Sequence, residues 1–209
     1  MRIYIRSYKP VHQGAGVKIE LALENEETGE RADASVTVSF DDYSDMTSFI
    51  KAGEISEEVL SVLEEKARIY QAYSYGTYLL GFGECSRKKM VYKLERKGHD
   101  RESAERAADM LVQAGYIDEF ELIHEAMLHA CRDKCYGRKR IISELYAKGF
   151  EREDIREAFR LYEGELDYDE AKRQLICRKY GTDKPEFSDI KEKKKMLAML
   201  YRYGHDAGF

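Results

Sequence analysis

Residues 138–150 read RKRIISELYAKGF, and nearly the same sequence occurs twice more, as RKKMVYKLERKGH at residues 87–99 and KKKMLAMLYRYGH at residues 193–205. Every copy starts with three basic residues and has a glycine as its last residue but one. Apolar residues stand eight, seven and four positions before that glycine, which places them on one face of a helix. A glycine at this point is typical of a helix that ends in a left-handed turn. The sequence therefore predicts the same short amphipathic helix three times.

The first two copies belong to a longer repeat. Each is followed by a second amphipathic stretch, and then by GYIDE or LDYDE, which aligns Asp118 with Asp169 and Glu119 with Glu170. A repeat of about 50 residues and three helices cannot bury its apolar face alone, so neighbouring repeats must stack. We expect a mainly α-helical fold of tandem three-helix repeats in an elongated array. The predicted repeats are residues 61–118, 119–166 and 167–209, the last with its third helix missing or reduced to a stub.

Residues 1–60 have the period of β-strands in their first part. VKIELALE and ASVTVSF alternate apolar and polar residues on either side of the turn sequence ENEETGE, and RIYIR predicts a third strand. From residue 42 the period is helical: DDYSDMTSFIKAG predicts a short helix ended by Gly53, and Ser56 suits the N-cap of a long helix. We expect a small antiparallel sheet before the helical repeats.

Charge is distributed unevenly along the chain. Residues 1–63 carry 6 basic and 12 acidic side chains, net −6, whereas residues 64–209 carry 29 and 28, net +1, so the two parts face different electrostatic partners. No apolar run is long enough to cross a membrane, and the N-terminus lacks the features of a secretory signal. We therefore expect a cytoplasmic protein with no membrane partner.

The cysteines and histidines do not form a complete metal site. Cys131 and Cys135 have the spacing of one helical face, but no CxxC pair supplies the other ligands. In HEAMLH, His124 and His129 are five residues apart, whereas the zinc-protease helix needs histidines four apart. No nucleophile with its base is identifiable from spacing. We expect reduced thiols, no metal, no cofactor and no enzymatic activity.

Three segments, LVQAGYIDEFELIHEAM, YGRKRIISELYAKGFEREDIREAF and DYDEAKRQLICRKYG, occur in an order and spacing that resemble the RecX family of recombinase regulators. The resemblance covers residues 60–205, and the strand-rich N-terminal part is similar to the extension of longer members. One segment departs from the family's pattern: GFGEC precedes Ser86, where the family often has a basic, proline-containing stretch.

The resemblance implies a protein of DNA repair and recombination that binds the RecA–single-stranded DNA filament. Members of the family lie along the groove of that filament and modulate, usually by inhibition, its strand exchange, ATPase and coprotease activities. The family has no cofactor or catalytic residue. We therefore expect the RecA filament and its single-stranded DNA as partners, and a monomeric chain.

The basic triplets at the start of the three repeated helices are the candidate binding residues. Cations are not favoured at a helix N-terminus, and packing does not require them, so their recurrence indicates contact with phosphates or with an acidic protein surface. The alternative is a merely solvated face. The nine residues are Arg87, Lys88, Lys89, Arg138, Lys139, Arg140, Lys193, Lys194 and Lys195.

Tyrosines accompany the triplets and have two interpretations. They can stack on nucleic-acid bases, but tyrosines at helical spacing more often pack helices together, which is the interpretation favoured here. We expect Tyr116 and Tyr168 to pack between successive repeats, with Asp118 and Asp169 capping the next helices. The tyrosines near the triplets are Tyr92, Tyr136, Tyr146, Tyr201 and Tyr203.

A second function remains open, that of a general nucleic-acid-binding helical array without a recombinase partner. The net charge of −5 and the isoelectric point near 5.7 argue against it, because an autonomous DNA-binding protein normally carries an excess of positive charge.

Overall fold

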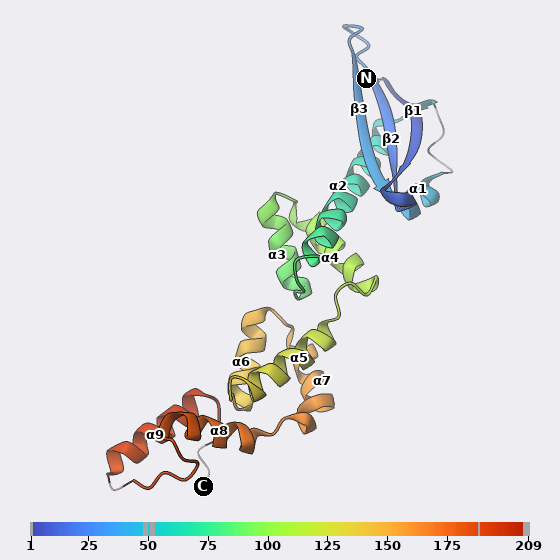
Figure 1. Ribbon diagram of the computed structural model, residues 1–209. Coiled ribbons are helices and arrows are strands. Elements are labelled where there is room, and N and C mark those ends of the chain that lie inside the picture. The colour runs from blue at the N-terminus through green and yellow to red at the C-terminus, as the bar shows by residue number, and fades with distance from the viewer. Residues whose placement is uncertain (1, 48–49, 51–52, 188, 207–209) are drawn as a thin grey trace. The chain divides into compact units, whose positions relative to one another are not determined.

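The computed structural model describes residues 2–47, 50, 53–187 and 189–206 (Figure 1). It is mainly α-helical with an antiparallel sheet near the N-terminus, which confirms the predicted fold class. The chain divides into two compact units, each described here by itself. The first unit is Met1–Gly83 with Met90–Tyr116, and the second is Glu84–Lys89 with Ile117–Phe209.

The first unit contains a four-stranded antiparallel sheet in the order β3-β2-β1-β4. The strands are β1 (Arg2–Val11), β2 (Gly16–Glu24), β3 (Arg31–Ser39) and β4 (Gly53–Ile55). The three longer strands are those that the alternating pattern predicts. The fourth was missed, because it has only three residues and no alternation to detect.

Gly53 does not end a helix, contrary to the prediction. Helix α1 (Phe40–Met46) ends earlier, and Gly53 begins β4 opposite Ile5. Its φ of 134° is open to glycine but not to residues with a Cβ, so the glycine serves the entry into a strand rather than a helix stop.

The sheet packs its buried face against the long helix α2 (Glu57–Leu80). Ile19 and Leu21 of β2 form one core cluster with Val38 of β3 and Leu63 of α2. The Oγ of Ser56 accepts a hydrogen bond from the Val59 N–H at 3.3 Å, as the N-cap prediction requires. The sheet thus fixes the first half of α2.

Two further helices complete the first unit beside α2. They are α3 (Arg87–Lys97), whose first three residues belong to the second unit, and α4 (Arg101–Gln113). Helix α4 packs closely on α2 at Gly76, where a Cβ would lie 2.7 Å from the Leu111 side chain. These three helices correspond to the first predicted repeat.

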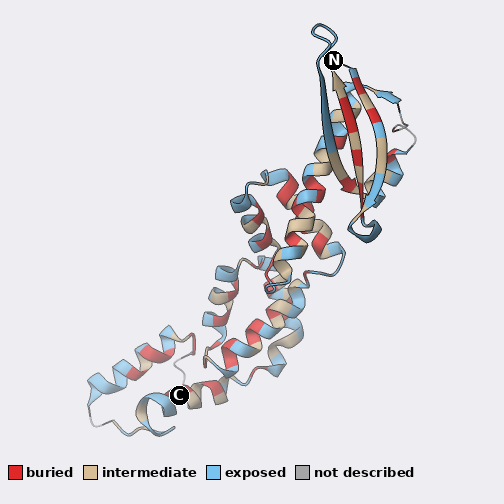
Figure 2. Ribbon diagram, turned by 45° about the horizontal axis from the view of Figure 1, so that its top comes forward, coloured by how far each residue is buried: buried red, intermediate tan, exposed pale blue. Residues whose placement is uncertain are grey.

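The second unit is all helical. It comprises α5 (Glu119–Arg132), α6 (Arg138–Lys148), α7 (Arg152–Tyr162), α8 (Tyr168–Tyr180) and α9 (Ile190–Arg202), with a 3-10 turn at Glu163–Glu165. The buried residues of each helix lie along one side, as Figure 2 shows, and together they form one continuous hydrophobic core. Helices α5 to α7 correspond to the second predicted repeat, and α8 and α9 to the third.

The repeated sequence forms the predicted helix in all three copies, as α3, α6 and α9. In each copy the apolar residue eight positions before the glycine and the leucine four positions before it are buried, and the glycine has a left-handed φ between 83° and 105°. The buried residues are Met90, Leu94, Ile141, Leu145, Met196 and Leu200, and the glycines are Gly98, Gly149 and Gly204.

The alignment of Asp118 with Asp169 is wrong by two residues. Asp118 caps α5 by accepting from the Glu121 N–H at 3.0 Å, and the residue that does the same for α8 is Asp167, which accepts from Glu170 at 2.8 Å. Asp169 lies in the first turn of α8 instead. The second repeat is therefore two residues shorter than the sequence alignment assumes, and Glu119 corresponds to Tyr168 rather than to Glu170.

The boundaries of the repeats remain predictions. Helix α2 begins at Glu57, so the boundary placed between residues 60 and 61 falls within that helix. The expected third helix of the last repeat falls partly on residues 207–209, which lie outside the described residues.

Candidate binding surface

All nine residues of the basic triplets belong to the second unit. The first two triplets begin α3 and α6, as predicted. The third does not begin a helix. Helix α9 begins earlier, at Ile190, because the Oδ1 of Asp189 accepts from the Lys191 N–H at 2.9 Å and caps it there. Lys193–Lys195 therefore lie in the second turn of α9.

The N-terminal end of α3 is already hydrogen-bonded. The Oγ of Ser86 accepts from the Lys89 N–H at 3.4 Å, and the carboxylate of Glu119 accepts from the Arg87 N–H at 2.5 Å. Burial raises the pKa of Glu119, although the hydrogen bond from Arg87 opposes that shift. These bonds occupy the N–H groups of Arg87 and Lys89, so these two groups are not open to an anion.

The residue before each of the first two triplets contacts the end of the repeated helix in the next repeat. The Oγ of Ser86 donates to the Lys148 carbonyl at 3.0 Å, and the N–H of Gly137 donates to the Tyr203 carbonyl at 2.8 Å. Each acceptor directly precedes a helix-ending glycine. We call these two contacts, both of which lie within the second unit, the repeat junctions, since in each the residue before a triplet donates to the carbonyl before a helix-ending glycine.

The second repeat junction requires glycine on both sides. A Cβ on Gly137 would lie 2.7 Å from the backbone nitrogen of His205, and a Cβ on Gly204 would lie 2.6 Å from the Cβ of Arg140. Gly137 was not singled out from the sequence. Its position directly before a triplet, where Ser86 stands in the other copy, was the available signal.

The middle lysine of each of these triplets forms an ion pair across its repeat junction. Lys88 lies 3.7 Å from Glu151, and Lys139 lies 2.5 Å from Asp206, each acid being the second residue after the helix-ending glycine. The charge at this position thus contributes to packing within the second unit, which the sequence interpretation did not foresee. All four side chains are more than 60% exposed, so both lysines remain accessible to a competing anion.

The two arginines of the second triplet also have partners. The Nε of Arg138 lies 2.6 Å from Glu163, and its guanidinium carbon lies 4.9 Å from the centre of the Phe159 ring. Arg140 pairs with Glu144 at 3.1 Å. This triplet is therefore the most neutralised of the three.

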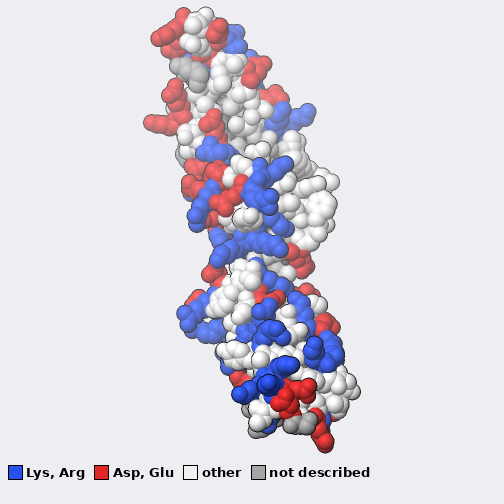
Figure 3. All heavy atoms as spheres, turned by 90° about the vertical axis from the view of Figure 1, so that its left-hand side faces the viewer, with Lys and Arg blue, Asp and Glu red and all other residues white. Residues whose placement is uncertain are grey.

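Three lysines of the triplets are exposed and have no ion pair with any residue that the structure describes. They are Lys89, Lys194 and Lys195. Figure 3 shows Lys and Arg side chains over much of the visible helical surface, with Asp and Glu among them. None of the described helices combines the length and the apolar character that crossing a membrane requires.

The tyrosines near the triplets divide into two groups. Tyr136 and Tyr203 pack edge to face with ring centres 5.7 Å apart, as expected of packing residues. Tyr92, Tyr146 and Tyr201 are 58%, 47% and 72% exposed, so for these the packing interpretation is wrong. Exposed rings beside basic residues can stack on bases.

The expectation for the two tyrosines at the start of successive repeats is also only half right. Tyr168 packs against the core of the second unit, and burial together with nearby Glu163 raises the pKa of its hydroxyl. Tyr116 is 54% exposed.

The cysteines and histidines considered as metal ligands are not arranged as a metal site among the described residues. Cys131 lies in α5, but Cys135 lies beyond its end with a φ of 55°, so they do not share a helical face as expected. Burial raises the pKa of both thiols, which makes them unreactive. His124 stacks on Tyr162, with ring centres 4.1 Å apart. Among the described residues no group of three or more potential ligands is placed to hold a metal ion.

Comparison with known proteins finds regulators with a common name. The chain is 32% identical over 123 residues to "Regulatory protein RecX" of Stenotrophomonas maltophilia (strain R551-3), a match that covers 59% of this chain and 72% of the relative. It is 27% identical over 143 residues to the protein of that name from Mycobacterium sp. (strain JLS), covering 68% and 78%. No protein-family model matches the chain.

Two solved structures share the fold. The crystal structure of regulatory protein RecX superposes with a TM-score of 0.70 at 19% identity, covering 98% of this chain and 95% of that one. The structure of RecX from Lactobacillus salivarius gives a TM-score of 0.56 at 18% identity, covering 67% and 90%. With the sequence relatives, the repeats and the sheet all in agreement, this chain belongs to the RecX family of regulatory proteins.

Proposed function

We propose that this chain binds the RecA–single-stranded DNA filament and inhibits its strand exchange, ATPase and coprotease activities, acting as a monomer in the cytoplasm without catalysis of its own. The observation that carries the proposal is the recurrence of exposed lysines at the same place in three repeats of a RecX-family chain.

The nine basic side chains contribute to this binding in different ways. Three of the lysines are exposed and have no ion pair with a described residue, so they can contact phosphates without first breaking an ion pair. They are Lys89, Lys194 and Lys195. Lys88 and Lys139 must give up Glu151 and Asp206 first. Because exposed ion pairs are weak, that exchange costs little.

The mixture of charges suits a filament better than free DNA. Acidic side chains stand among the basic ones, and the chain has a net charge of −5, so non-specific attraction to nucleic acid is weak. A filament presents protein as well as phosphate, and the acidic residues beside the lysines then have partners too. The exposed rings of Tyr92, Tyr146 and Tyr201 provide surfaces for stacking.

The test is to add the chain to RecA filaments already assembled on single-stranded DNA and to follow ATP hydrolysis. We expect hydrolysis to slow as the chain is added. An unchanged rate at several-fold excess of the chain contradicts the proposal. Binding to naked DNA together with an unchanged rate favours the general nucleic-acid-binding function instead.

Salt dependence measures how many of the nine residues contact phosphate. For single-stranded DNA, nine contacts give a slope of log affinity against log salt of about −6, and three contacts give about −2. We expect a slope between these limits for filament binding. A slope near zero contradicts phosphate contact.

A further inference from the structure

The sheet of the first unit has two edges that differ in how they are protected against pairing with a further strand. At one edge β4 has only three residues, and the part of β1 beyond it carries Lys9, Pro10 and a shift in register between Ile5 and Ser7. Short strands, lysine, proline and bulges are the features by which proteins keep sheet edges from pairing. The other edge is β3, which has nine residues and none of these features.

The second half of β3 is uncharged. Residues 34–39 read ASVTVS, in which valine and threonine favour strands. The charged residues of β3 lie before this segment and have partners, since Arg31 pairs with Glu24 at 3.0 Å and Asp33 pairs with Arg6 at 2.8 Å. The exposed edge therefore offers a strand-forming sequence without a charge that would repel a neighbour.

Ser35 and Thr37 turn their backbone N–H and C=O groups away from the sheet. Pro10 of β1 lies opposite Val17 and has no N–H to donate, which indicates that Val17 forms its ladder bonds on its other side, with Val38. Along an antiparallel pair, every second residue is bonded to the neighbouring strand. Thr37 and Ser35 stand one and three residues from Val38, so their groups point outward.

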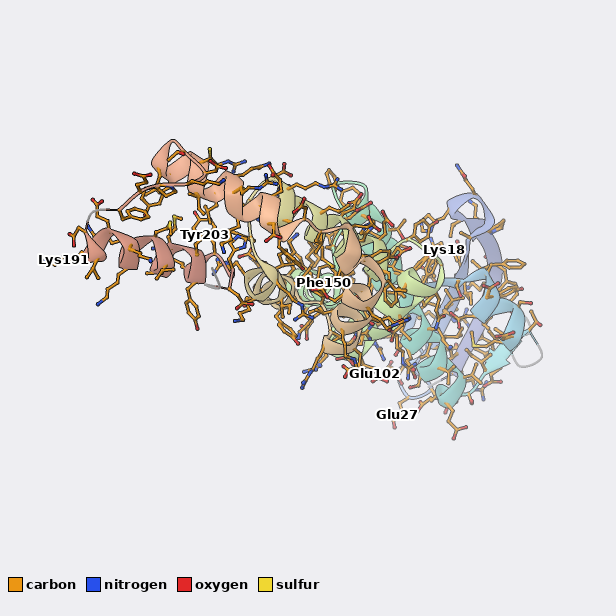
Figure 4. All side chains as sticks on the ribbon, turned by 90° about the horizontal axis from the view of Figure 1, so that it is seen from below. Lys18, Glu27, Glu102, Phe150, Lys191 and Tyr203 are labelled. Atoms are coloured by element: carbon orange, nitrogen blue, oxygen red, sulfur yellow. The ribbon has the colours of Figure 1, made fainter. Side chains whose placement is uncertain are left out.

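A second bond shows the same alternation. The Phe40 N–H donates to the Ala15 carbonyl at 3.1 Å, in phase with the bonding of Val38. Lys18, which is labelled in Figure 4, lies opposite Thr37 on β2, the neighbour on the inner side. The outward groups of β3 have no hydrogen bond with any residue that the structure describes.

A groove of about 670 Å³ lies between this edge and helix α2. Strand β3 contributes Ser35, Val36 and Thr37 to its lining. Helix α2 contributes a stripe of residues at helical spacing, which includes Glu64, Ala67, Arg68 and Gln71. We call this site the edge groove. A free strand edge forms one side of it and a helix forms the other, so an extended segment fits between them.

Glu64 is a charged residue of the edge groove that is open to a partner. It is exposed and has no ion pair with any described residue. Arg68, in contrast, lies 3.9 Å from Asp100. Residues 1–63 have a net charge of −6, so this end of the chain attracts cations. An occupant with a basic residue is therefore favoured.

Neither the remaining residues of this chain nor a second copy suits the edge groove. No run outside the described residues is longer than three residues, so none can pair along residues 34–39. Helix α2 lies against β3, where Val38 shares a core with Leu63. If two copies joined their β3 strands, about 4.8 Å apart, their α2 helices would come closer than the roughly 8–10 Å that packed helices need.

We propose that the edge groove binds an extended segment of a partner protein, which adds to the sheet as a further strand beside β3. The backbone of that segment bonds the outward groups of Ser35 and Thr37. Its apolar side chains face Val36 and Ala67, and a basic side chain pairs with Glu64. In this kind of recognition main-chain hydrogen bonds supply the affinity and alternate side chains supply the specificity. None of these residues belongs to the basic triplets, so the site is distinct from the one proposed for the filament.

The probe is a labelled peptide, KTVTVTVTK, with acetyl and amide ends. Its valines and lysines share one face, which is turned to α2, and a lysine at each end reaches Glu64 in either strand direction. Fluorescence anisotropy follows its binding to the full chain, and hydrogen exchange follows the amides of β3. We expect saturable binding that slows exchange within residues 34–39.

N-methylation of the peptide tests whether its main chain is recognised. One version carries the methyl groups on its valines and the other on its threonines, so each lacks alternate N–H donors. Only one of these two sets faces β3. We expect one version to bind at least tenfold more weakly than the other. Equal binding by the two versions overturns the proposal.

Variants of Ser35 locate the binding on the edge. Ser35→Pro removes an outward N–H, which edge strands tolerate, and should weaken peptide binding at least tenfold. Ser35→Ala keeps the N–H and should leave peptide binding unchanged. Circular dichroism checks that both variants are folded.

A charge exchange at Glu64 tests the proposal even if Ser35→Pro does not fold. Glu64→Lys should weaken binding of KTVTVTVTK at least threefold and should strengthen binding of ETVTVTVTE. Glu58→Lys makes the same change on α2 outside the edge groove and should alter neither.

Three further results overturn the proposal. The first is no binding of the peptide to the parent chain. The second is equal binding by folded Ser35→Pro and Ser35→Ala chains, together with no effect of Glu64→Lys. The third is a dimer of the chain in sedimentation that Ser35→Pro dissociates, which makes a second copy the occupant. None of these bears on the filament assay, so the two proposals fail separately.

Discussion

Lys139 is a residue at which packing and binding compete for one charge. It pairs with Asp206 across the second repeat junction, although both side chains are largely exposed. Lys194 occupies the same place in the third repeat and has no acidic partner among the described residues. Removal of Lys139 therefore breaks an ion pair, whereas removal of Lys194, its equivalent in the third repeat, breaks none with a described residue.

This difference predicts the result of an alanine pair. Lys139→Ala should lower the melting temperature of the chain, more at low salt than at high salt, because it removes an exposed ion pair. Lys194→Ala is the matched control and should leave the melting temperature unchanged. Thermal unfolding by circular dichroism at two salt concentrations measures both. Equal melting temperatures of the two variants would mean that the pair with Asp206 does not hold the junction.

His205 predicts a pH dependence at the same junction. It is buried directly after Gly204, its Nε2–H donates to the Cys135 carbonyl at 2.9 Å, and burial lowers its pKa. The hydrogen bond to the Cys135 carbonyl opposes this shift, nearby Lys172 lowers the pKa further, and nearby Asp169 and Asp206 raise it, but the net shift is downward. The folded chain therefore keeps His205 neutral at a pH where the unfolded chain protonates it.

The stability that comes from neutral His205 is complete above the unfolded pKa of about 6.5 and is lost as pH falls below it. Phe150 occupies the equivalent buried position after Gly149, so His205→Phe is the matched variant. We expect the parent chain to lose stability relative to this variant between about pH 7 and pH 5. Urea unfolding at several pH values measures the free energy of unfolding of both proteins. If the two free energies change in parallel with pH, His205 is not the cause of the pH dependence.

At the scale of elements, the second repeat junction sets how α6 meets α9 within the second unit. Ser86 and Gly137 each donate a hydrogen bond to the carbonyl that precedes a helix-ending glycine. At Gly137 the backbone of Gly204 and His205 lies so close that no Cβ fits. Gly137 has an ordinary helical-entry conformation, with a φ of −81°, so only the lack of space demands glycine there.

Gly137→Ala should therefore destabilise the chain by about 1–3 kcal/mol, since the added methyl group forces α6 and α9 apart. Gly164→Ala is the control, because a Cβ at Gly164 meets nothing within 4 Å. Chemical denaturation of both variants measures the free energies of unfolding. A Gly137→Ala protein as stable as the control would show that the two helices separate without cost.

At the scale of the whole molecule, the sequence predicts what is local and misses what is distant. The apolar spacing, the left-handed glycines and the Ser56 cap all follow from contacts within one helix, and the structure confirms them. The ion pair of Lys139 joins residues 67 apart, and the bond of Ser86 joins residues 62 apart. No periodicity within a helix reports such pairs.

The errors in register have the same origin. Asp169 fits the aligned motif, but Asp167 caps the helix, because α7 has 11 residues where α4 has 13. Asp189 starts α9 before the third triplet for a similar reason, since the segment between α8 and α9 is longer than the one between α5 and α6. The length of a helix explains the first error, and the length of a loop explains the second.

The central claim is that exposed lysines recurring through the repeats bind the recombinase filament. Its most direct test compares the affinity of the parent chain for assembled RecA–single-stranded DNA filaments with that of a variant carrying Lys89→Ala, Lys194→Ala and Lys195→Ala. These side chains have no ion pair with a described residue, so the melting temperature should not change. We predict at least tenfold weaker binding, about 1.4 kcal/mol. Equal affinity of the two proteins would contradict the account.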